Sequence, residues 1–422
     1  MSKKNQTYSR REFFKLTGAA GIGSAIASFG NVAGASALGD SSDAGPQLVP
    51  TRPFGKTGEH VSMLSFGGSQ NLMSKQLLLR QAFKMGVTYW DTAESYSGGK
   101  SEQAMGKYFQ KFPTDRKKIF LVSKARNSTP AELSQSLHQS LERLKTDYLD
   151  LYFLHMVGDV KKQLTPEVKA WAEKAKSEGK IRFFGFSTHK NMEIGLMEGA
   201  KLGWIDGIMT TYNYRLMNTD DMKRAIEACT KAGIGLTAMK TQAKFFARFY
   251  ADVGSLSGAE EALSDRFLKR GFTPEQTKLK AVWENPRIAS ICSEMPNMTI
   301  LRANVAAALD KNELSYQDRH LLEGYAHESA FGYCAGCAKL CESALNHTVP
   351  VSDIMRYLMY HDEYDSPQRA VRLFHDLHPM MRKNLALINY SSAEQSCPQK
   401  LPIARLMNRA VNVLSMNVTR IV

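Results

Sequence analysis

The sequence has no long hydrophobic run beyond its N-terminal region. Although 43% of its 422 residues are hydrophobic, no later stretch stays apolar for the roughly 18 residues that a transmembrane helix needs. Basic residues outnumber acidic ones, 55 to 41, but they are scattered and form no basic stripe or recognisable nucleic-acid module. These absences argue against an integral membrane segment in the mature chain and against a nucleic-acid partner.

The N-terminal region has the pattern of a targeting segment. A basic leader ends in SRREFFK (9–15), a weakly apolar Gly/Ala-rich run follows, and Ala-Ser-Ala (35–37) offers the small residues that a signal peptidase requires. This arrangement resembles a twin-arginine export signal, which carries folded proteins, often with a cofactor already inserted. We therefore expect a signal peptide over 1–37, a linker over 38–53 and a periplasmic location in a bacterium. The competing interpretation is a chance Arg-Arg pair in a disordered tail.

From residue 54 to residue 312, strand-like runs alternate with helical segments. The runs are apolar and rich in β-branched or aromatic residues, as strands buried on both faces are. They lie at 61–68, 87–96, 119–125, 147–155, 181–189, 206–214, 233–241 and 288–296. Between them, Pro130 and Pro166 fall near expected helix starts, and Gly179 and Gly233 near expected helix ends.

Eight such units predict an α/β fold, a (β/α)8 TIM barrel. No Gly-x-Gly-x-x-Gly follows a strand-like run, which argues against a Rossmann fold. The connection 242–287 is longer than the others, and we expect it to hold a helix pair that covers the barrel mouth.

Three successive strand-like runs end in ionisable side chains. Asp91 and Tyr96 close one run, Lys124 the next and His155 the third. Because parallel barrels build active sites at the C-terminal ends of their strands, we expect the four to converge. There the ammonium would lower the pKa of the tyrosine, the carboxylate would hold the ammonium, and the imidazole would orient a carbonyl. Each residue also has a structural interpretation, as a helix cap, a packed aromatic, an ion-pair partner or a core histidine.

The segment DTAESYSGGKSEQAMG resembles the signature of the aldo/keto reductase superfamily around its catalytic Asp and Tyr. The resemblance covers about residues 50 to 310 and places the family's catalytic groups on Asp91, Tyr96, Lys124 and His155. It implies an oxidoreductase that transfers a hydride between a nicotinamide cofactor, NADP or NAD, and a carbonyl or alcohol substrate.

The same resemblance suggests where the nucleotide binds. Ser187 in GFSTH would touch the nicotinamide amide, and Asn213 in TTYNY would be a further cofactor contact. Arg302 and Asn304 in MPNMTILRANVAA match the pattern that grips the adenosine phosphate, although the usual basic residue directly after the strand is missing. Lys240, after the seventh run, is a candidate phosphate contact or a solvated rim lysine.

Cysteine is scarce and unevenly placed. Two of the six cysteines fall in the barrel region and are expected to be small buried hydrophobes, Cys229 and Cys292. The other four lie after residue 330, in YCAGCAKLCES and QSCPQKLPI, as Cys334, Cys337, Cys341 and Cys397. Thiolates spaced by two or three residues can face one metal centre, and a closing Cys-Pro is common in iron–sulfur proteins.

This segment resembles the C-terminal ferredoxin-like extension of iron–sulfur aldo/keto reductases. The resemblance implies a small α-helical iron–sulfur domain over 313–422 that holds one 4Fe-4S cluster on these four cysteines. Tyr390 and Ala393 stand where further ligands would be, so a second cluster is excluded by count. A zinc site, two disulfides and an empty site remain alternatives.

Together these patterns predict an exported oxidoreductase with an accessory cluster for electron transfer, a small-molecule substrate and a redox protein as a candidate partner. One alternative is a catalytically silent barrel that serves as a redox-sensing or binding subunit. Another is lysine-based aldolase chemistry, which the carboxylate of Asp91 disfavours because it would keep Lys124 charged.

Overall fold

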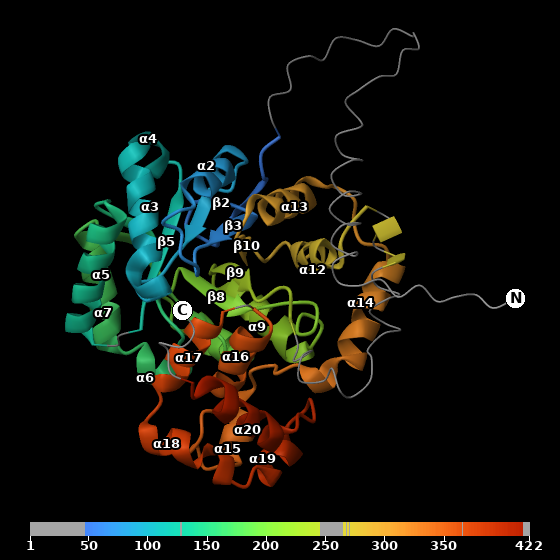
Figure 1. The fold of residues 1–422 in the computed structure, drawn as a ribbon. Coiled ribbons are helices and arrows are strands. Elements are labelled where there is room, and N and C mark those ends of the chain that lie inside the picture. Colours follow the sequence, from blue (N-terminus) through green and yellow to red (C-terminus); the bar gives the residue numbers. More distant parts are fainter. Residues whose placement is uncertain are drawn as a thin grey trace, which may run out of the picture.

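The computed structural model describes residues 47–126, 129–244, 265–266, 268–269, 271–364 and 366–416 (Figure 1). The expected signal peptide and most of the expected linker lie outside the described residues. So does the aromatic segment 245–255 of the long connection that was expected to cover the barrel mouth. In the part of the chain that is described, no helix is both long and apolar enough to cross a membrane.

Eight parallel strands close into a barrel, as the alternating pattern predicts. Each pairs with its neighbours in chain order, and the last strand pairs with the first. The strands are β3 Leu64–Gly67, β4 Tyr89–Asp91, β5 Phe120–Ala125, β6 Leu149–Leu154, β7 Ile181–Thr188, β8 Gly207–Thr211, β9 Gly235–Met239 and β10 Ser290–Glu294. All eight predicted runs contain one of these strands, so the (β/α)8 barrel is confirmed.

The first predicted run, 61–68, differs in detail because it is divided between two strands. Its start belongs to β2 (His60–Ser62), which forms an antiparallel hairpin with β1 (Thr51–Pro53) outside the barrel sheet. The Ser62 hydroxyl donates to the backbone oxygen of Leu64 at 2.8 Å and so fixes the bend between β2 and β3. The hairpin leads Phe54 into the barrel interior, where it is fully buried.

Helices surround the barrel. They are α2 Gln76–Lys84, α3 Lys100–Lys111, α4 Pro113–Arg116, α5 Pro130–Leu144, α6 Val160–Gln163, α7 Pro166–Ser177, α8 Met192–Lys201, α9 Asp220–Lys231, α12 Pro274–Trp283 and α13 Met298–Leu309. Pro130 and Pro166 occupy first helical positions, each after a threonine whose side chain caps the helix. Gly179 and Gly233 have φ values of 70° and 69° and end the preceding helices.

The chain after the barrel is helical. Its elements are α14 Tyr316–Glu328, η3 Ala330–Gly332, α15 Ala338–Ser343, α16 Val351–Asp362, α17 Pro367–His375, α18 Pro379–Asn384, η4 Leu385–Leu387, α19 Ser391–Ser396 and α20 Ile403–Leu414. Helix α14 packs on the barrel core through Leu322 and Tyr325. From Cys341 onward the helices share a core of their own, which includes Leu358 and Phe374.

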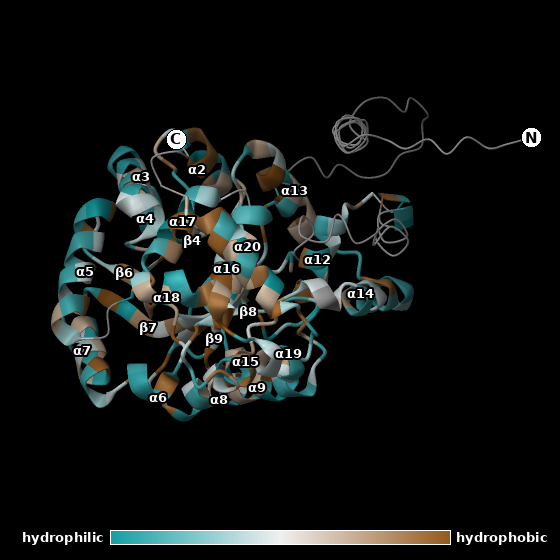
Figure 2. Ribbon diagram, turned by 60° about the horizontal axis from the view of Figure 1, so that its bottom comes forward, coloured by the Kyte–Doolittle hydropathy of each residue, from teal (hydrophilic) through white to brown (hydrophobic). Residues whose placement is uncertain are grey.

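This C-terminal extension, residues 333–416, lies against the barrel where α16 and α17 approach the strands (Figures 1 and 2). Three contacts place it at the C-terminal ends of the strands. Lys190, after β7, pairs with Asp353 of α16 at 3.0 Å. The backbone N–H of Asn191 donates to Gly336 O at 2.8 Å, and Lys244 Nζ to Glu363 O at 2.7 Å. The extension therefore faces the end of the barrel where active sites are built.

Candidate active site

The interior of the barrel carries a buried ion pair at the ends of two neighbouring strands. Side chains alternate along β4 and β5, so Asp91 and Lys124 face inward with the interior residues Tyr89 and Val122. Lys124 Nζ donates to Asp91 Oδ1 at 2.7 Å and to the backbone oxygen of Thr92 at 2.7 Å. Burial is the largest effect and opposes the charged ammonium, but Asp91, Tyr96 and Cys292 together outweigh it and hold the pKa of Lys124 above its ordinary value.

Tyr96 meets this pair from the turn that follows β4. The turn needs left-handed backbone at Ser97, Gly98 and Gly99, which have φ values of 51°, 64° and 86°, and glycine adopts this conformation readily. It brings the Tyr96 hydroxyl to 3.5 Å from Lys124 Nζ, and the same nitrogen lies 4.8 Å from the ring centroid.

The electrostatics of Tyr96 differ from the sequence-based expectation. Burial raises the pKa of Tyr96 above its ordinary value, and the positive charge of Lys124 offsets only part of that rise. Lys124 lowers the pKa of Tyr96 as expected, but the larger effect of burial makes the net shift upward. The phenol is protonated at neutral pH, and this is the form that can donate a proton.

His155 completes the group from the residue after β6. Its ring meets the Tyr96 ring edge-on, with centroids 5.7 Å apart and an interplanar angle of 79°. Burial, followed by the charges of Lys124 and nearby arginines, lowers the pKa of His155 well below its ordinary value, so the imidazole is neutral. Its Nδ1 is buried and has no hydrogen-bond partner within the described residues. The structure thus brings all four predicted catalytic residues together.

A fifth ionisable residue near Tyr96 has no signal in the sequence. Arg369, in α17 of the extension, lies with its guanidinium carbon 5.4 Å from the centroid of the Tyr96 ring. Nothing in the helical pattern around Arg369 distinguishes it from the other basic residues of α17. Its position depends on how the extension folds over the barrel mouth.

Ser187, expected to touch the nicotinamide amide, and Asn213, expected to be a further cofactor contact, both have protein partners. The Ser187 hydroxyl accepts a hydrogen bond from the Met156 backbone N–H at 3.1 Å, which leaves its own proton to donate. Asn213 uses both amide protons, one on Lys240 O at 3.1 Å and one on the Tyr333 hydroxyl at 3.0 Å. Its side-chain oxygen accepts from the backbone N–H of Arg215 at 3.1 Å. Ser187 can therefore still donate to a ligand, whereas both amide protons of Asn213 are in use and only its oxygen can accept a further hydrogen bond.

The other predicted nucleotide contacts are spread over two places. Lys240 ends β9 and points at the extension, with Nζ 4.1 Å from the Tyr360 ring centroid. Arg302 and Asn304 lie on α13, after β10. Arg302 is exposed, while Asn304 is buried and donates to Ser293 Oγ at 3.0 Å. The structure does not bring Lys240 together with the α13 pair.

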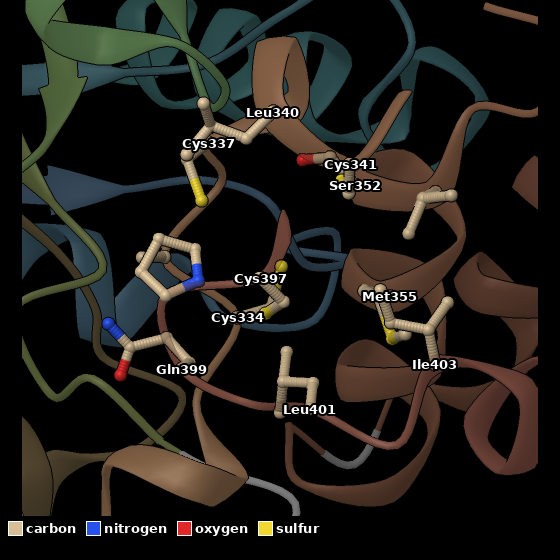
Figure 3. A pocket seen from close by; sticks show the side chains of 13 residues that line it. Cys334, Cys337, Leu340, Cys341, Ser352, Met355, Cys397, Gln399, Leu401 and Ile403 are labelled. Carbon is tan, nitrogen blue, oxygen red and sulfur yellow. The ribbon is translucent and has the colours of Figure 1, made fainter. Parts of the chain in front are cut away.

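The four C-terminal cysteines line a single pocket with about 360 Å³ of empty space. Cys337 points into the space in which Cys334 and Cys397 lie (Figure 3). The remaining walls are mostly apolar and include Leu340, Val351, Met355, Leu401 and Ile403. Of the helices between Cys341 and Cys397, α16 packs against α17, and Cys397 and Pro398 line the pocket.

The geometry of this pocket argues against two of the alternatives. All six cysteines of the chain are free, so the two disulfides considered as an alternative are not formed. Among the described residues no group of three or more His, Cys, Asp or Glu side chains is arranged to hold a single metal ion. A four-thiolate zinc site, in which each sulfur lies about 2.3 Å from the ion, is therefore not preformed. Cys229 is fully buried in α9, and Cys292 is half-buried in β10 next to the interior residues.

Known proteins resemble this chain over the barrel. Residues 63–316 match the family model described as "Aldo/keto reductase family". L-galactose dehydrogenase from Arabidopsis thaliana is 23% identical over 299 residues, which cover 65% of this chain and 93% of that protein. An uncharacterized oxidoreductase from Bacillus subtilis is 34% identical over 123 residues, but only 39% of its length is covered.

Solved structures give the same result. An aldo-keto reductase from Bacillus halodurans in its holo form superimposes with a TM-score of 0.53 at 23% identity, covering 66% of this chain and 96% of that one. An aldo-keto reductase from Klebsiella pneumoniae in complex with NADPH gives 0.52 at 26% identity, covering 66% and 95%. The predicted enzyme class, an oxidoreductase, agrees with these relatives. The family model matches more than half of the sequence, and this chain belongs to the aldo/keto reductase family.

Proposed function

We propose that this protein reduces a carbonyl compound, or oxidises the corresponding alcohol, with a nicotinamide cofactor as the partner in hydride transfer. The observation that carries this proposal is a protonated phenol, Tyr96, next to the buried Lys124–Asp91 pair. When a carbonyl oxygen gains negative charge, Tyr96 can give it a proton. The resulting phenolate would be stabilised by the adjacent ammonium, which Asp91 keeps charged and in position. The neutral imidazole of His155 can donate a hydrogen bond from its ring N–H to the same oxygen.

Some of the residues predicted to bind the cofactor are available to it, and one is not. A bound nicotinamide supplies the hydride. The relative from Klebsiella pneumoniae was solved with NADPH, which supports NADP as the cofactor here. Ser187 retains a proton to donate to the nicotinamide amide, and Arg302 is exposed and available to a phosphate. Asn213 can join them only if Tyr333 of the extension releases its amide.

The cysteine pocket supports an accessory 4Fe-4S cluster. A cubane cluster attaches at four separate corners, so its ligands stand farther apart than those of one ion, and four free thiols around one apolar pocket suit that arrangement. Such a group exchanges single electrons with a partner. Burial raises the pKa of Cys337 to about 11 and that of Cys341 to about 12, so iron would have to displace the protons on binding.

The N-terminal pattern supports export by the twin-arginine route to the periplasm, with the barrel at 54–312 and the iron–sulfur domain at 313–422 as successive units. A cluster inserted before export is compatible with that route. A catalytically silent barrel is not favoured, because the four catalytic positions are all occupied and assembled.

Turnover of purified protein with NADPH and a panel of carbonyl compounds tests the main proposal. We expect Tyr96→Phe to lower kcat by a factor of about 10² or more, the usual contribution of a positioned proton donor. Tyr316→Phe, at an exposed tyrosine, is the matched control and should have no effect. Unchanged turnover of Tyr96→Phe would remove this tyrosine from the mechanism.

The cluster is tested separately on protein purified without air. We expect broad visible absorption and about four iron and four sulfide per chain, as a single 4Fe-4S cluster requires. Cys337→Ser should lose most of both, while Cys229→Ala, at a buried barrel cysteine, should keep them. Zinc in place of iron, or colourless iron-free protein, would contradict the cluster.

A further inference from the structure

Three cations from the barrel and the extension surround one buried tyrosine at the barrel mouth. The Tyr360 ring centroid lies 4.1 Å from Lys240 Nζ, 4.5 Å from the guanidinium carbon of Arg369 and 5.8 Å from that of Arg356. Lys240 comes from the end of β9, while Arg356 and Tyr360 lie on α16 and Arg369 on α17. The cluster, which we call the mouth cations (Lys240, Arg356 and Arg369), exists only because the extension folds over the strand ends.

The charges at this place do not balance. Asp353 pairs with both Arg356 and Lys190 and is therefore shared. Within the described residues, neither Lys240 nor Arg369 has a carboxylate within 4 Å. Burial alone would raise the pKa of Tyr360, but the three cations bring it down to about 6.

Even an ionised Tyr360 leaves an excess of positive charge. Glu342 interacts with both Lys190 and Asp353, so Asp353, Glu342 and the phenolate together set three negative charges against Lys190 and the three mouth cations, and one positive charge remains. Among the other described residues that interact with this group, Lys124 is matched by Asp91, while Arg126 and Lys244 add positive charge. Partly buried cations without a counter-charge are costly, so the arrangement is suited to an anion that is not part of the chain.

The mouth cations lie directly beside the catalytic residues. Arg369 contacts the faces of both Tyr360 and Tyr96, so it bridges the cation cluster and the proton donor. A pocket that is partly open to solvent adjoins them and is lined by His189, Lys240 and Arg356 among others. The Nδ1 atoms of His189 and His155 are buried and lack hydrogen-bond partners within the described residues. Buried polar atoms are nearly always satisfied in native proteins, so a bound ligand or an ordered water is expected to supply partners for these two.

We propose that the mouth cations bind the carboxylate of the substrate, so that this reductase acts on oxo acids or the corresponding hydroxy acids. This inference rests on the proposed function and adds the substrate class. Arg369 and Lys240 would bind the carboxylate, and the carbonyl of the same molecule would reach Tyr96. Arginine is suited to this role because its planar guanidinium can donate two parallel hydrogen bonds to a carboxylate. The phosphates of a nucleotide are a poorer fit for Arg369, because it lies against the reacting tyrosine.

Binding of an unreactive analogue tests the proposal without turnover. The probe is 2-hydroxyisobutyrate, a carboxylate whose tertiary alcohol has no hydride to lose, and 2-hydroxyisobutyramide is its neutral counterpart. Titration calorimetry on the full mature protein should show binding of the carboxylate and at least about tenfold weaker binding of the amide.

The variants identify the residues responsible. Arg369→Met should weaken carboxylate binding about tenfold or more and leave amide binding unchanged, and Arg369→Lys should restore part of the affinity. Lys240→Met is the second variant, in case the first does not fold. Arg372→Met, at an exposed arginine of the same helix α17, is the matched control and should bind as wild type does.

Several results would overturn the proposal. They are no binding of the carboxylate by wild-type protein, equal binding of carboxylate and amide, or carboxylate binding that survives both Arg369→Met and Lys240→Met. Loss of NADPH binding in Arg369→Met, with carboxylate binding intact, would assign these cations to the cofactor and would also overturn it.

Turnover separates this inference from the function on which it rests. Pyruvate and pyruvamide differ only in the charged group. A preference for pyruvate that disappears in Arg369→Met supports the proposed substrate class. Equal turnover of the two compounds would leave carbonyl reduction intact and refute the carboxylate site. Carboxylate binding without turnover of any carbonyl would keep the site and refute the reductase.

Discussion

The side-chain amide of Asn213 in the barrel donates a 3.0 Å hydrogen bond to the hydroxyl of Tyr333 in the extension. Tyr333 directly precedes Cys334, which lines the cysteine pocket. The same cysteine also lines the cavity beside the mouth cations, so the two pockets share a wall. Asn213, the predicted cofactor contact, is therefore connected to the proposed cluster through Tyr333 and Cys334, which are neighbours in the chain.

Tyr333→Phe is expected to tighten nucleotide binding. The substitution keeps the ring and removes the hydroxyl, so one amide proton of Asn213 becomes available to a cofactor. A hydrogen bond of this kind contributes about 1 kcal/mol, so we expect NADPH to bind a few-fold more tightly, as measured by fluorescence titration. Tyr390→Phe is the control, because it also removes a buried phenol hydrogen bond in the extension but lies far from Asn213. Unchanged or weaker NADPH binding in Tyr333→Phe would show that Tyr333 does not compete with the cofactor.

Removing one member of the Lys124–Asp91 pair is expected to destabilise the barrel more than removing both. Lys124→Met leaves a buried carboxylate without its counter-charge, which costs about 3 to 5 kcal/mol in comparable pairs. Adding Asp91→Leu should recover much of that stability, because no buried charge is left. Denaturant unfolding of the two variants and wild type measures the difference. Both variants should be inactive, since neither has the ammonium beside Tyr96. A double variant less stable than Lys124→Met would contradict this account.

The barrel and its catalytic rim could be predicted from the sequence because both follow local patterns. Each strand is a short apolar run, and the side chain that ends it faces the mouth whatever the rest of the chain does. The position of Lys124 next to Asp91 needed only the order of two neighbouring strands. The net rise in the pKa of Tyr96 could not be predicted from the sequence, because it depends on how completely the folded chain buries the hydroxyl.

The mouth cations could not be predicted from the sequence either, because their arrangement depends on contacts between distant parts of the chain. Lys240 and Arg369 belong to separate elements, and only the packing of the extension on the strand ends brings them to one ring. The hydrogen bond from Asn213 to Tyr333 is likewise a contact between residues far apart in the chain. The remote Cys397, by contrast, could be grouped with the other three cysteines from the sequence, because the Cys-Pro ending is itself a recognisable pattern, and all four line one pocket.

Gly235→Ala is expected to destabilise the barrel strongly. A Cβ at this position of β9 would lie 2.4 Å from the ring of Phe54, which is fully buried at the hairpin end of the barrel. Overpacking of this kind typically costs about 1 to 3 kcal/mol. Gly324→Ala, in α14 with open space around the new methyl, should be neutral or slightly stabilising because alanine favours helix. Thermal unfolding compares the two, and equal stability of Gly235→Ala and wild type would contradict the tight packing of Phe54.

Tyr360 predicts a specific dependence of stability on pH. Lys240, Arg369 and Arg356 lower the pKa of its hydroxyl to about 6 in the folded protein, whereas the unfolded chain has the ordinary value of about 10. Between these values the folded state has lost the proton and the unfolded state keeps it. The contribution of Tyr360 to stability is therefore fully present above about pH 10, declines by about 1.4 kcal/mol per pH unit as the pH falls, and is gone below about pH 6. Unfolding of wild type and Tyr360→Phe across this window measures the difference, with Tyr390→Phe as a control whose offset from wild type should not vary from pH 6 to 9. If the difference in unfolding free energy between wild type and Tyr360→Phe stays constant with pH, the mouth cations do not ionise this tyrosine. If that difference vanishes when 2-hydroxyisobutyrate is bound, the ligand's carboxylate has replaced the phenolate as their counter-charge.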